Sequence, residues 1–416
     1  MLASLRRLKH INDLVDWFWR NGSAKSTSSP RNPNRSGTMK TIFDCWFKKT
    51  KKKKKTILDL PEDLVEDEII SRLPISSLRS VRSTCKKWNT LCKNRILFGK
   101  AAKKQFLMMD SRRICLMNLD LSKDNGDPSI KQVSVLDQKF QIPMVFQSDG
   151  LLLCVLKDYS RLVVWNPYLG QMRWIEPRNS FHSSDRFALG HDSNFNYKIL
   201  RISSEIHPVT ERKVLGFELY DFTSSSWKVL DDVTPKRRQI RSCQQCESLK
   251  GNAYFLTSVR GSFRCFDFTT ERFGPPLPLP PFHSYDGFHC TSFSCVREEQ
   301  QLAVLYQRWE WESSDTIEIS VTDKIGPDDV SWTKFLKVNT GYWVYPTARS
   351  FLVDEEKKLA VVFVLDKLSS GCLYQTAHVF GQDGYFKYVR IGEAPYLRNM
   401  VCSSYLPSLL QLNQPG

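Results

Sequence analysis

The stretch SDGLLLCVLKDYSRLVVWNPYLGQMRWIE, residues 148–176, contains short apolar runs that end at turn residues. Runs of four to eight apolar residues bounded by turns are typical of β-strands. Here one strand ends in Asn, a turn follows, and an aromatic residue opens the next strand. The same phrase recurs along the chain, more weakly in its last copy: Trp165-Asn166 leads to Trp174, Tyr220-Asp221 to Trp227, Phe266-Asp267 to Phe273, Val321-Thr322-Asp323 to Trp332, and Val379-Phe380 to Tyr385.

The spacing of these phrases predicts the architecture of the chain after Gln105. Successive copies start 55, 46, 55 and 58 residues apart. A period of about 50 residues in an all-β chain is typical of a β-propeller, because each four-stranded blade buries its faces only against its neighbours. A weaker first copy lies between Ile114 and Leu136, which makes six kelch-like blades if strands near Met400 to Tyr405 close the ring. An irregular pair of β-sandwiches is the competing fold.

Residues 56–105 carry a helical pattern instead. Pro61 suits a first helical position, where its missing N–H costs nothing, and apolar residues follow at helical spacing. A second apolar stripe runs from Leu78 to Cys92 at intervals of three and four residues. A module of about fifty residues cannot bury such a wide apolar face by itself. It is therefore expected to bind a partner or to pack on the rest of the chain, and the whole protein is mainly β with a small N-terminal α module.

The string LPEDLVEDEIISRLPISSLRSVRSTCKKWNTLC, residues 60–92, resembles an F-box. It joins a Leu-Pro start, an Ile-rich helix, a second Leu-Pro and a Cys-Lys-x-Trp helix in the order of that family. The resemblance implies a three-helix module that binds the Skp-family adaptor of Skp, cullin and F-box ubiquitin ligases, and reaches the cullin through it. Cys85 and Trp88 would mainly hold the helices together. The adaptor-binding residues implied by position are Leu60, Pro61, Leu64, Ile69, Ile70, Leu73, Pro74, Leu78 and Val81.

The F-box pattern of this chain contains one extra residue. Pro61 and Pro74 are thirteen positions apart, whereas the usual family spacing is twelve. Because Val65, Ile69 and Leu73 stay in phase, the extra residue is expected between Glu62 and Leu64, in a loop or a bulge of the first helical turn. This placement shifts Leu60 and Pro61 relative to the helix, which bears on adaptor affinity rather than on fold.

The region after the F-box resembles a second family. Residues 148–176, the string YDFTSSSWKVL and the segment PPLPLPP (Pro275 to Pro281) are similar to the F-box-associated interaction domain that follows plant F-boxes. The resemblance covers roughly Asp137 to Tyr405 and implies that this domain holds the protein substrate. Within a chain of blades, the proline-rich segment is interpreted as an extended connector. A polyproline ligand for an aromatic groove is the other interpretation.

The positive charge of the chain is concentrated at its start. Of the 60 Lys and Arg residues, 15 lie in residues 1–55 with only three acids, so this segment carries +12 of the total +16. Residues 21–40 are polar and are expected to be disordered, and residues 48–55 form a lysine run typical of nuclear import signals or of solubilising stretches. The remaining 361 residues carry only +4, which argues against nucleic acid as a partner. Nucleus, cytoplasm or both are the expected locations.

No catalytic or cofactor motif stands out. The sequence has no Walker loop, H-E-x-x-H or G-x-S-x-G, so phosphate-binding, metalloprotease and serine-hydrolase chemistry lack their minimal parts. Cys243 and Cys246 have metal-like spacing, but a closed zinc site needs four ligands, so we expect no metal and no cofactor. The longest clean apolar runs, Leu151 to Leu156 and Leu359 to Leu365, are far below the roughly 20 residues that span a bilayer. A non-catalytic protein without membrane contact is expected.

Candidate substrate contacts are Arg residues in a local basic spot and aromatic residues near predicted strand ends. Such side chains are favoured anchors when they are exposed at interfaces. The alternative is that the aromatics belong to the blade cores and that the Arg residues are simply solvated. The residues are Arg237, Arg238, Trp309, Trp311, Trp343 and Tyr345.

These patterns predict three parts: a basic tail (1–55), an F-box (56–105) and a propeller-like substrate-binding domain (106–410). Residues from Lys100 to Ile114 are the expected linker. The function that follows is the substrate-recognition subunit of a Skp-cullin-F-box ligase, in which ubiquitin transfer depends on effective concentration rather than on chemistry in this chain. The alternative is a propeller that acts as a binding or scaffold protein without recruiting a cullin. The sequence does not name the protein substrate.

Overall fold

The structure is a computed structural model that describes residues 86, 88, 105–110, 113–121, 128–135, 142–206, 213–231, 246–257, 261–282, 289–296, 300–308, 316–341, 346–367, 373–393, 403–405 and 408–412. The chain divides into two units, residues 1–73 with 80–95 and residues 74–79 with 96–416. In the first unit, Lys86 and Trp88 are helical and Trp88 is buried. Within the described residues, no helix is both long enough and apolar enough to cross a bilayer.

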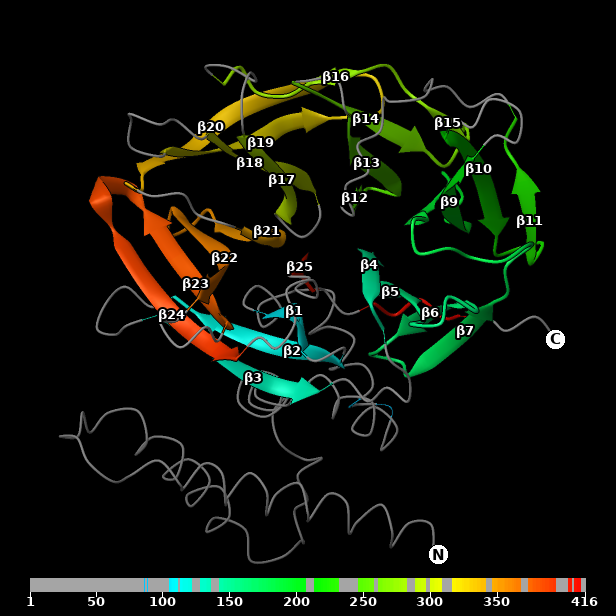
Figure 1. Ribbon diagram of the computed structural model, residues 1–416, viewed down its shortest axis with the longest axis horizontal. Helices are drawn as coiled ribbons and strands as arrows, with labels where there is room; N and C mark the ends of the chain where they lie inside the picture. Colours follow the sequence, from blue (N-terminus) through cyan, green and yellow to red (C-terminus); the bar gives the residue numbers. More distant parts are fainter. Residues whose placement is uncertain are drawn as a thin grey trace, which may run out of the picture. The chain divides into compact units, whose positions relative to one another are not determined.

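The second unit consists of six antiparallel sheets, numbered blades 1 to 6, that form a ring (Figure 1). Blade 1 contains β1 (Gln105–Asp110), β2 (Arg113–Asp120), β3 (Ser129–Val135) and β25 (Ser403–Ser404). Blade 2 contains β4 (Met144–Ser148), β5 (Leu151–Val155), β6 (Leu162–Asn166) and β7 (Gln171–Ile175). Blade 3 contains β8 (Arg186–His191), β9 (Tyr197–Ile206), β10 (Lys213–Asp221) and β11 (Ser226–Val229).

The other half of the ring repeats this plan. Blade 4 contains β12 (Cys246–Leu249), β13 (Asn252–Leu256), β14 (Ser262–Asp267), β15 (Arg272–Phe273) and β16 (Leu277–Pro278). Blade 5 contains β17 (His289–Val296), β18 (Gln301–Arg308), β19 (Thr316–Ile325) and β20 (Val330–Asn339). Blade 6 contains β21 (Pro346–Asp354), β22 (Leu359–Lys367), β23 (Leu373–Gly381), the short 3-10 helix η5 (Gln382–Gly384) and β24 (Phe386–Glu393).

The ring closes between the two ends of the domain. β25 supplies the first strand of blade 1 and pairs with β1, with Phe106 opposite Ser404 and Leu107 opposite Ser403. The predicted six-bladed propeller and its closure near Tyr405 are therefore confirmed, and the sandwich alternative is wrong. The expected linker from Lys100 to Ile114 is wrong in part, because β1 already belongs to blade 1.

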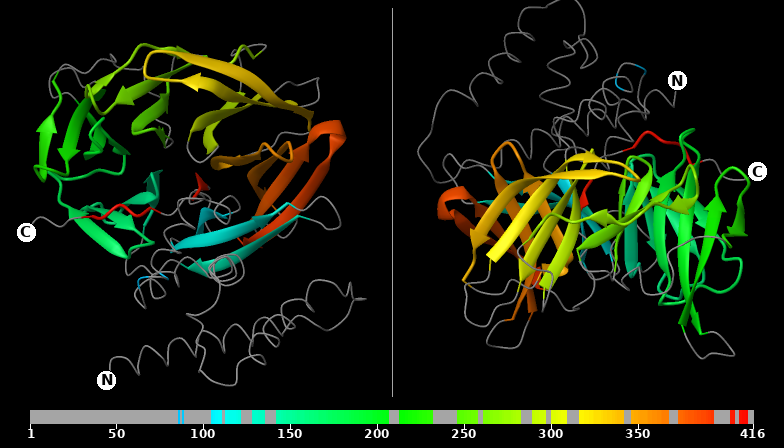
Figure 2. Two further views of the ribbon diagram at one scale, coloured as in Figure 1. Left: turned by 180° about the vertical axis from the view of Figure 1, so that it is seen from behind. Right: turned by 90° about the horizontal axis from the view of Figure 1, so that it is seen from above.

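A C-terminal strap, residues 408–412, continues from β25 onto blade 2. The Asn166 side-chain amide donates to the carbonyl oxygens of Ser408 (3.1 Å) and Leu410 (2.8 Å). The Leu412 N–H donates to the side-chain oxygen of Gln171 at 2.9 Å, and Leu412 is buried in the cluster between blades 2 and 3. Figure 2 shows this red segment beside blade 2. The strap thus joins the closing strand of blade 1 to its neighbour.

The apolar runs form strands because both faces of each blade are covered. Every residue of β5 and of β6 is buried, as expected for continuous apolar runs in a sheet packed on two sides. Buried clusters join blades 2 and 3, 3 and 4, 4 and 5, 5 and 6, and 6 and 1. Blade-to-blade packing is the main hydrophobic interaction of this domain.

The recurring Asn or Asp caps the turn that follows the third strand of its blade. The side-chain oxygens of Asn166, Asp221 and Asp267 accept backbone N–H groups two or three residues later, at 2.7–3.1 Å. Such turns suit Asn and Asp because their side chains imitate a backbone turn. Asp323 differs: β19 runs on to Ile325, and a bulge at Asp323 leaves its carboxylate to accept the Thr333 hydroxyl at 2.7 Å.

Two aromatic residues of the phrase, Trp227 and Trp332, each fasten their blade to the blade before it. The indole N–H of Trp227 in blade 3 donates to the carbonyl oxygen of Glu176, just after blade 2, at 2.7 Å. The indole of Trp332 in blade 5 donates in the same way to Pro278 of blade 4 at 2.9 Å. The proline-rich segment is extended as predicted, and its residues Leu277–Pro278 pair with β14. The repeat therefore marks both turns and blade junctions.

The two ends of the ring carry different kinds of connection. The turns between the first and second strands and between the third and fourth strands of each blade lie at one end, here named the hairpin end. The turns between second and third strands, and the connections from one blade to the next, lie at the other end, named the connector end. Because β1 is a second strand, the chain enters the ring at the hairpin end.

Candidate functional site

The predicted adaptor-binding residues lie outside the described residues. This holds for Leu60, Pro61, Leu64, Ile69, Ile70, Leu73, Pro74, Leu78 and Val81, and for Cys85. Trp88 is described, and only 5% of its surface is exposed. A buried indole fits its expected role of holding helices together.

The predicted substrate contacts, Arg237, Arg238, Trp309, Trp311, Trp343 and Tyr345, also lie outside the described residues. The strand ends that flank them are described. They are the end of β11 and start of β12, the end of β18 and start of β19, and the end of β20 and start of β21. By the antiparallel order of each blade, all six strand ends lie at the connector end. The three segments that contain the predicted substrate contacts span more than a hundred residues of sequence, yet all three connect strands at one end of the ring.

The described part of the connector end includes the connection from blade 2 to blade 3, residues 176–185. A buried arginine, Arg201 of β9, holds this connection. Its guanidinium lies 2.7 Å from a carboxylate oxygen of Asp185 and 2.9 Å from one of Glu218, and it donates to the Ser180 carbonyl at 2.7 Å. It also stacks 4.9 Å from the centre of the Phe181 ring. The arginine therefore bonds the connection to β9 and β10 at once.

This ion network gives the connection a fixed shape. Arg201, Asp185 and Glu218 are all buried, and a buried charge is tolerated only when it is paired and hydrogen-bonded. Around it, Arg178, Asn179, Ser180, His182 and Ser183 remain exposed. The connector end thus offers a polar loop on a rigid base. Sequence reasoning missed this network, although an Arg inside the apolar run YKILRIS was a signal for it.

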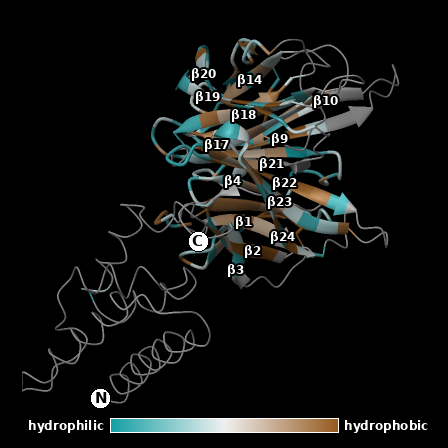
Figure 3. Cartoon of the chain, turned by 90° about the vertical axis from the view of Figure 1, so that its left-hand side faces the viewer, coloured by the Kyte–Doolittle hydropathy of each residue, from teal (hydrophilic) through white to brown (hydrophobic). Residues whose placement is uncertain are grey.

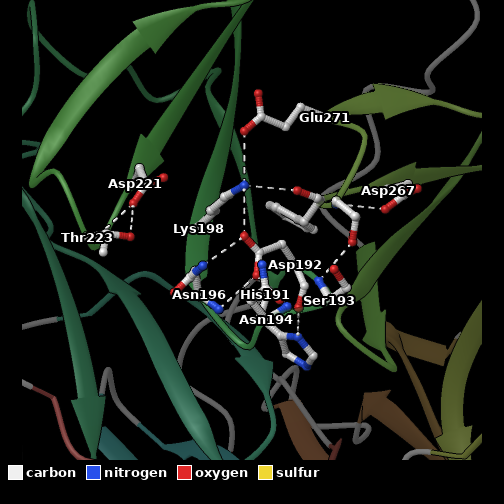
Figure 4. Close-up of polar contacts among 12 residues, drawn as sticks. His191, Asp192, Ser193, Asn194, Asn196, Lys198, Asp221, Thr223, Asp267 and Glu271 are labelled. Carbon is white, nitrogen blue, oxygen red and sulfur yellow. Dashed lines mark hydrogen bonds and ion pairs between the residues drawn. The ribbon is translucent and has the colours of Figure 1, made fainter.

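A second polar network lies at the hairpin end, between blades 3 and 4 (Figure 4). Lys198 of β9 is its centre, and its ammonium group lies 3.3 Å from Asp192 and 3.0 Å from Glu271. It also donates to the Phe268 carbonyl oxygen at 3.2 Å. Glu271 bonds Lys228 as well. Asp192 in turn caps the β8–β9 turn by accepting the backbone N–H groups of two asparagines at 2.9 and 3.0 Å.

The pKa values in this network shift toward the charged forms. Burial acts to raise the pKa of Asp192, but hydrogen bonds from Asn196, Asn194 and Lys198 outweigh it and leave the pKa below its ordinary value. Burial likewise opposes the shift at Glu271, whose pKa is lowered by Lys228 and Lys198. The pKa of Lys198 is raised, because the charges and hydrogen bonds of Glu271 and Asp192 outweigh its burial. All three groups are charged at neutral pH.

Close packing indicates a structural role for this second network. A Cβ atom at Gly190 would overlap the carbonyl oxygen of Gly251 and the ring of Phe268, both from blade 4. The blades therefore meet without free space beside Lys198. A charged group poised for catalysis would instead have a pKa near neutrality. We interpret this network as a junction between blades, which sequence reasoning missed because its residues are far apart along the chain.

The cysteine pair with metal-like spacing is described only at Cys246. Its thiol donates to the Phe187 carbonyl oxygen at 3.2 Å, and burial raises its pKa, which disfavours the thiolate that a metal would need. Cys243 lies outside the described residues. Among the residues that are described, no group of three or more His, Cys, Asp or Glu side chains is arranged to hold a metal ion.

The six-bladed ring follows a segment that is rich in Leu and Pro in the sequence. The family model of the F-box domain matches residues 57–100, and that of the F-box associated beta propeller domain matches residues 104–412. The chain belongs to the F-box proteins that carry this propeller. Both resemblances seen in the sequence are thereby confirmed.

Similar proteins over nearly the whole length come from Arabidopsis thaliana. The chain is 52% identical over 397 residues to F-box/kelch-repeat protein At3g13680, an alignment that covers 87% of this chain and 98% of the relative. It is 45% identical to F-box protein At3g49510, with 86% and 99% covered. It is 46% identical to F-box protein At1g10895, again with 86% and 99% covered. These plant relatives share the whole two-domain layout, which supports a role in substrate recognition.

Proposed function

We propose that this chain is the substrate-recognition subunit of a Skp-cullin-F-box ubiquitin ligase. The observation that supports this most strongly is the pairing of an F-box match at residues 57–100 with a closed propeller that starts at residue 105. In this proposal the F-box binds the Skp-family adaptor through the Leu60 to Val81 residues named above. The adaptor then links the chain to the cullin.

The protein substrate binds at the connector end of the ring. The six predicted contacts belong to segments that leave and re-enter the ring there, and the Arg201 network gives this end one rigid loop. Ubiquitin transfer then follows from effective concentration, and the chain itself performs no chemistry.

The adaptor requirement is tested by reconstitution. Tagged full-length chain is mixed with purified cullin in the presence or absence of the Skp-family adaptor, and cullin recovery is measured. We expect recovery only with the adaptor, and no recovery from a chain that carries Leu73→Ala with Leu78→Ala. Equal recovery with and without adaptor contradicts the proposal.

The substrate end is tested by comparing variants in plant cells. Proteins that accumulate when the chain is removed are measured after rescue with wild type or with Arg237→Glu and Arg238→Glu together. The matched control is Lys250→Glu, an exposed charge reversal in a turn at the hairpin end. We expect the control to restore turnover and the connector-end variant to fail. Rescue by both variants would place the substrate elsewhere.

A second candidate is a propeller that binds its target without recruiting a cullin. The observation in its favour is the thirteen-residue spacing from Pro61 to Pro74, one more than is usual. Absence of adaptor binding in a folded wild-type chain would select this candidate.

For the location of the protein in the cell we propose the nucleus, the cytoplasm or both, because the lysine run at residues 48–55 fits an import signal. Deleting residues 48–55 and imaging a fluorescent fusion tests this.

A further inference from the structure

An arginine and a tryptophan of blade 2 lie together, exposed, at the connector end. Arg161 is the last residue before β6, and Trp174 is the last residue but one of β7. The guanidinium carbon of Arg161 lies over the Trp174 ring, 4.5 Å from the ring centre. The side chain of Arg161 is 45% exposed, and Trp174 is 39% exposed. A cation–π contact of this kind holds both side chains in place while leaving them accessible.

Trp174 differs from the other exposed aromatic side chains in its location. Five large apolar side chains are exposed among the described residues, and Trp174 is the one aromatic of them near the connector end. Phe195 lies in a hairpin-end turn, and Phe386 and Tyr388 lie in the half of β24 that is nearer the hairpin end. For comparison, β22 is apolar along most of its length and hydrophilic where it reaches the connector end, at Asp366–Lys367 (Figure 3). Trp and Arg are residue types favoured as binding anchors.

The N–H donors of the Arg161 side chain are largely unused within the described residues. Its one polar partner there is Glu176, whose carboxylate oxygen lies 3.5 Å from Nη1. This distance exceeds the usual length of a charge-assisted hydrogen bond, and the Glu176 side chain is 70% exposed. Exposed ion pairs of this kind are weak and are screened by solvent. A carboxylate from another chain can therefore replace Glu176 on the guanidinium, whose planar donors can bind both of its oxygens.

A second exposed arginine, Arg178, lies in the connection that follows β7. Its Nε donates to a carboxylate oxygen of Glu218 at 2.8 Å. The Arg178 side chain is 47% exposed, whereas that of Glu218 is 9% exposed and also pairs with the buried Arg201. Within the described residues, the terminal nitrogen atoms of Arg178 have no hydrogen-bond partner. The connector end of blade 2 therefore presents two arginines whose donors are available to a ligand.

The charge near these arginines favours an anionic ligand. The turn between β5 and β6 adds Lys157 and Asp158, and the Asp158 carboxylate accepts the backbone N–H and the hydroxyl of Ser160 at 3.1 and 2.9 Å. The connection from blade 3 to blade 4 leaves and re-enters the ring at the same end. In sequence it contains more basic than acidic residues: Lys236, Arg237, Arg238 and Arg241 against Asp231 and Asp232. Carboxylates are complementary to this excess of positive charge.

We propose that Arg161 and Trp174 contact the protein substrate directly, and that the bound segment of the substrate is acidic with an apolar residue beside its carboxylate. The carboxylate of an Asp or Glu binds the Arg161 guanidinium in place of Glu176, and the neighbouring apolar side chain packs on the Trp174 ring. Arg178 pairs with a second carboxylate of the segment. Because the ring contact already fixes Arg161, little side-chain freedom is lost on binding. The inference rests on the proposed function, whose substrate end it shares, and adds the chemical class of the substrate.

Protein turnover in plant cells tests this proposal. The proteins that accumulate when the chain is removed are followed by pulse-chase measurement after rescue with each variant. Trp174→Ala and Arg161→Gln should each slow the turnover of these proteins by about threefold or more, because each removes one contact. Glu176→Gln should instead speed turnover by about twofold, because Arg161 loses its competing partner. The matched control is Phe195→Ala, which removes an exposed aromatic at the hairpin end and should restore the wild-type rate.

Cullin recovery through the Skp-family adaptor separates failure of this inference from failure of the proposed function. Wild type and every variant should recover cullin equally, and circular dichroism should show the same β signal in all of them. If cullin recovery is normal, unchanged turnover in Trp174→Ala or in Arg161→Gln overturns this inference and leaves the proposed function standing. Slower turnover in Glu176→Gln also overturns it, because the ion pair with Arg161 is then structural. A wild-type chain that recovers no cullin, or restores no turnover, contradicts the proposed function itself.

Discussion

The C-terminal strap is expected to stabilise the closed ring through Asn166. The side chain of Asn166 is fully buried and makes three hydrogen bonds, two as donor to the strap carbonyls and one as acceptor from the Leu169 N–H. Asn166→Asp keeps the acceptor but replaces the donor with an oxygen that faces the two strap carbonyls. At about 1 kcal/mol for each lost hydrogen bond, the cost is about 2 kcal/mol, and repulsion between the oxygens adds to it.

A double-mutant cycle isolates the strap contribution. The second change is truncation after Tyr405, which removes the strap and leaves β25 in place. In the truncated chain, Asn166→Asp should cost less than about 0.5 kcal/mol, because its acceptor still caps the turn and no strap carbonyl remains. Urea unfolding followed by circular dichroism of the β signal gives the four free energies. An equal cost of Asn166→Asp in both backgrounds would show that the strap carbonyls do not matter and would refute the reasoning.

Three further predictions concern the blade junctions. Trp227→Phe and Trp332→Phe should each lower the free energy of unfolding by about 1 kcal/mol, and the losses should add because the two indoles fasten different junctions; urea midpoints of the single and double variants check this. Gly190→Ala should abolish soluble expression because of its overlap with blade 4, whereas Gly392→Ala, with open space around it, should stay within about 0.5 kcal/mol of wild type; expression and unfolding of both variants decide this. Lys198→Met should lower the free energy of unfolding by about 2 kcal/mol at neutral pH. Wild type should lose stability as the pH falls below about 4, and this acid-induced loss should be smaller in the variant. Urea unfolding measured at several pH values checks both expectations.

The sign of that pH dependence follows from the direction of each shift. Asp192 and Glu271 have lowered pKa values in the folded state, so their contribution is present at neutral pH and is lost as the pH falls through those values. Lys198 has a raised pKa, so its contribution is present at and below neutral pH and is lost only at high pH, above its ordinary value. Stability that rises on acidification would contradict this assignment.

The fold was predictable from the sequence because the signal is local and repeated. A strand that ends in Asn166 or Asp221 needs a capped turn within three residues, and an aromatic residue such as Trp227 or Trp332 follows six to nine residues after the Asn or Asp. The period of about 50 residues then predicted four-stranded blades, and the weak copy near Ile114 raised the predicted number of blades to six. Asp323 shows the limit of this reasoning, because a one-residue bulge changed the end of its strand without changing the spacing.

The polar networks were not predictable from the sequence. Lys198 and Glu271 are 73 residues apart, and they meet only because blades 3 and 4 are adjacent in the ring. Glu318 is hidden beneath two lysines because of the register between β19 and β20, which no local pattern sets. The predicted adaptor and substrate residues stay predictions. The strands that flank the predicted substrate residues end or begin at the connector end.

Adaptor binding by the purified full-length chain tests the central claim most directly. Wild type is compared with a variant that carries Leu60→Ala, Pro61→Ala and Leu73→Ala, and circular dichroism checks that both retain the β signal. The proposed function predicts that wild type binds the Skp-family adaptor with a dissociation constant of about 1 μM or tighter and that the variant does not. A folded wild-type chain that shows no adaptor binding would contradict the claim and leave the propeller as a binding protein in its own right.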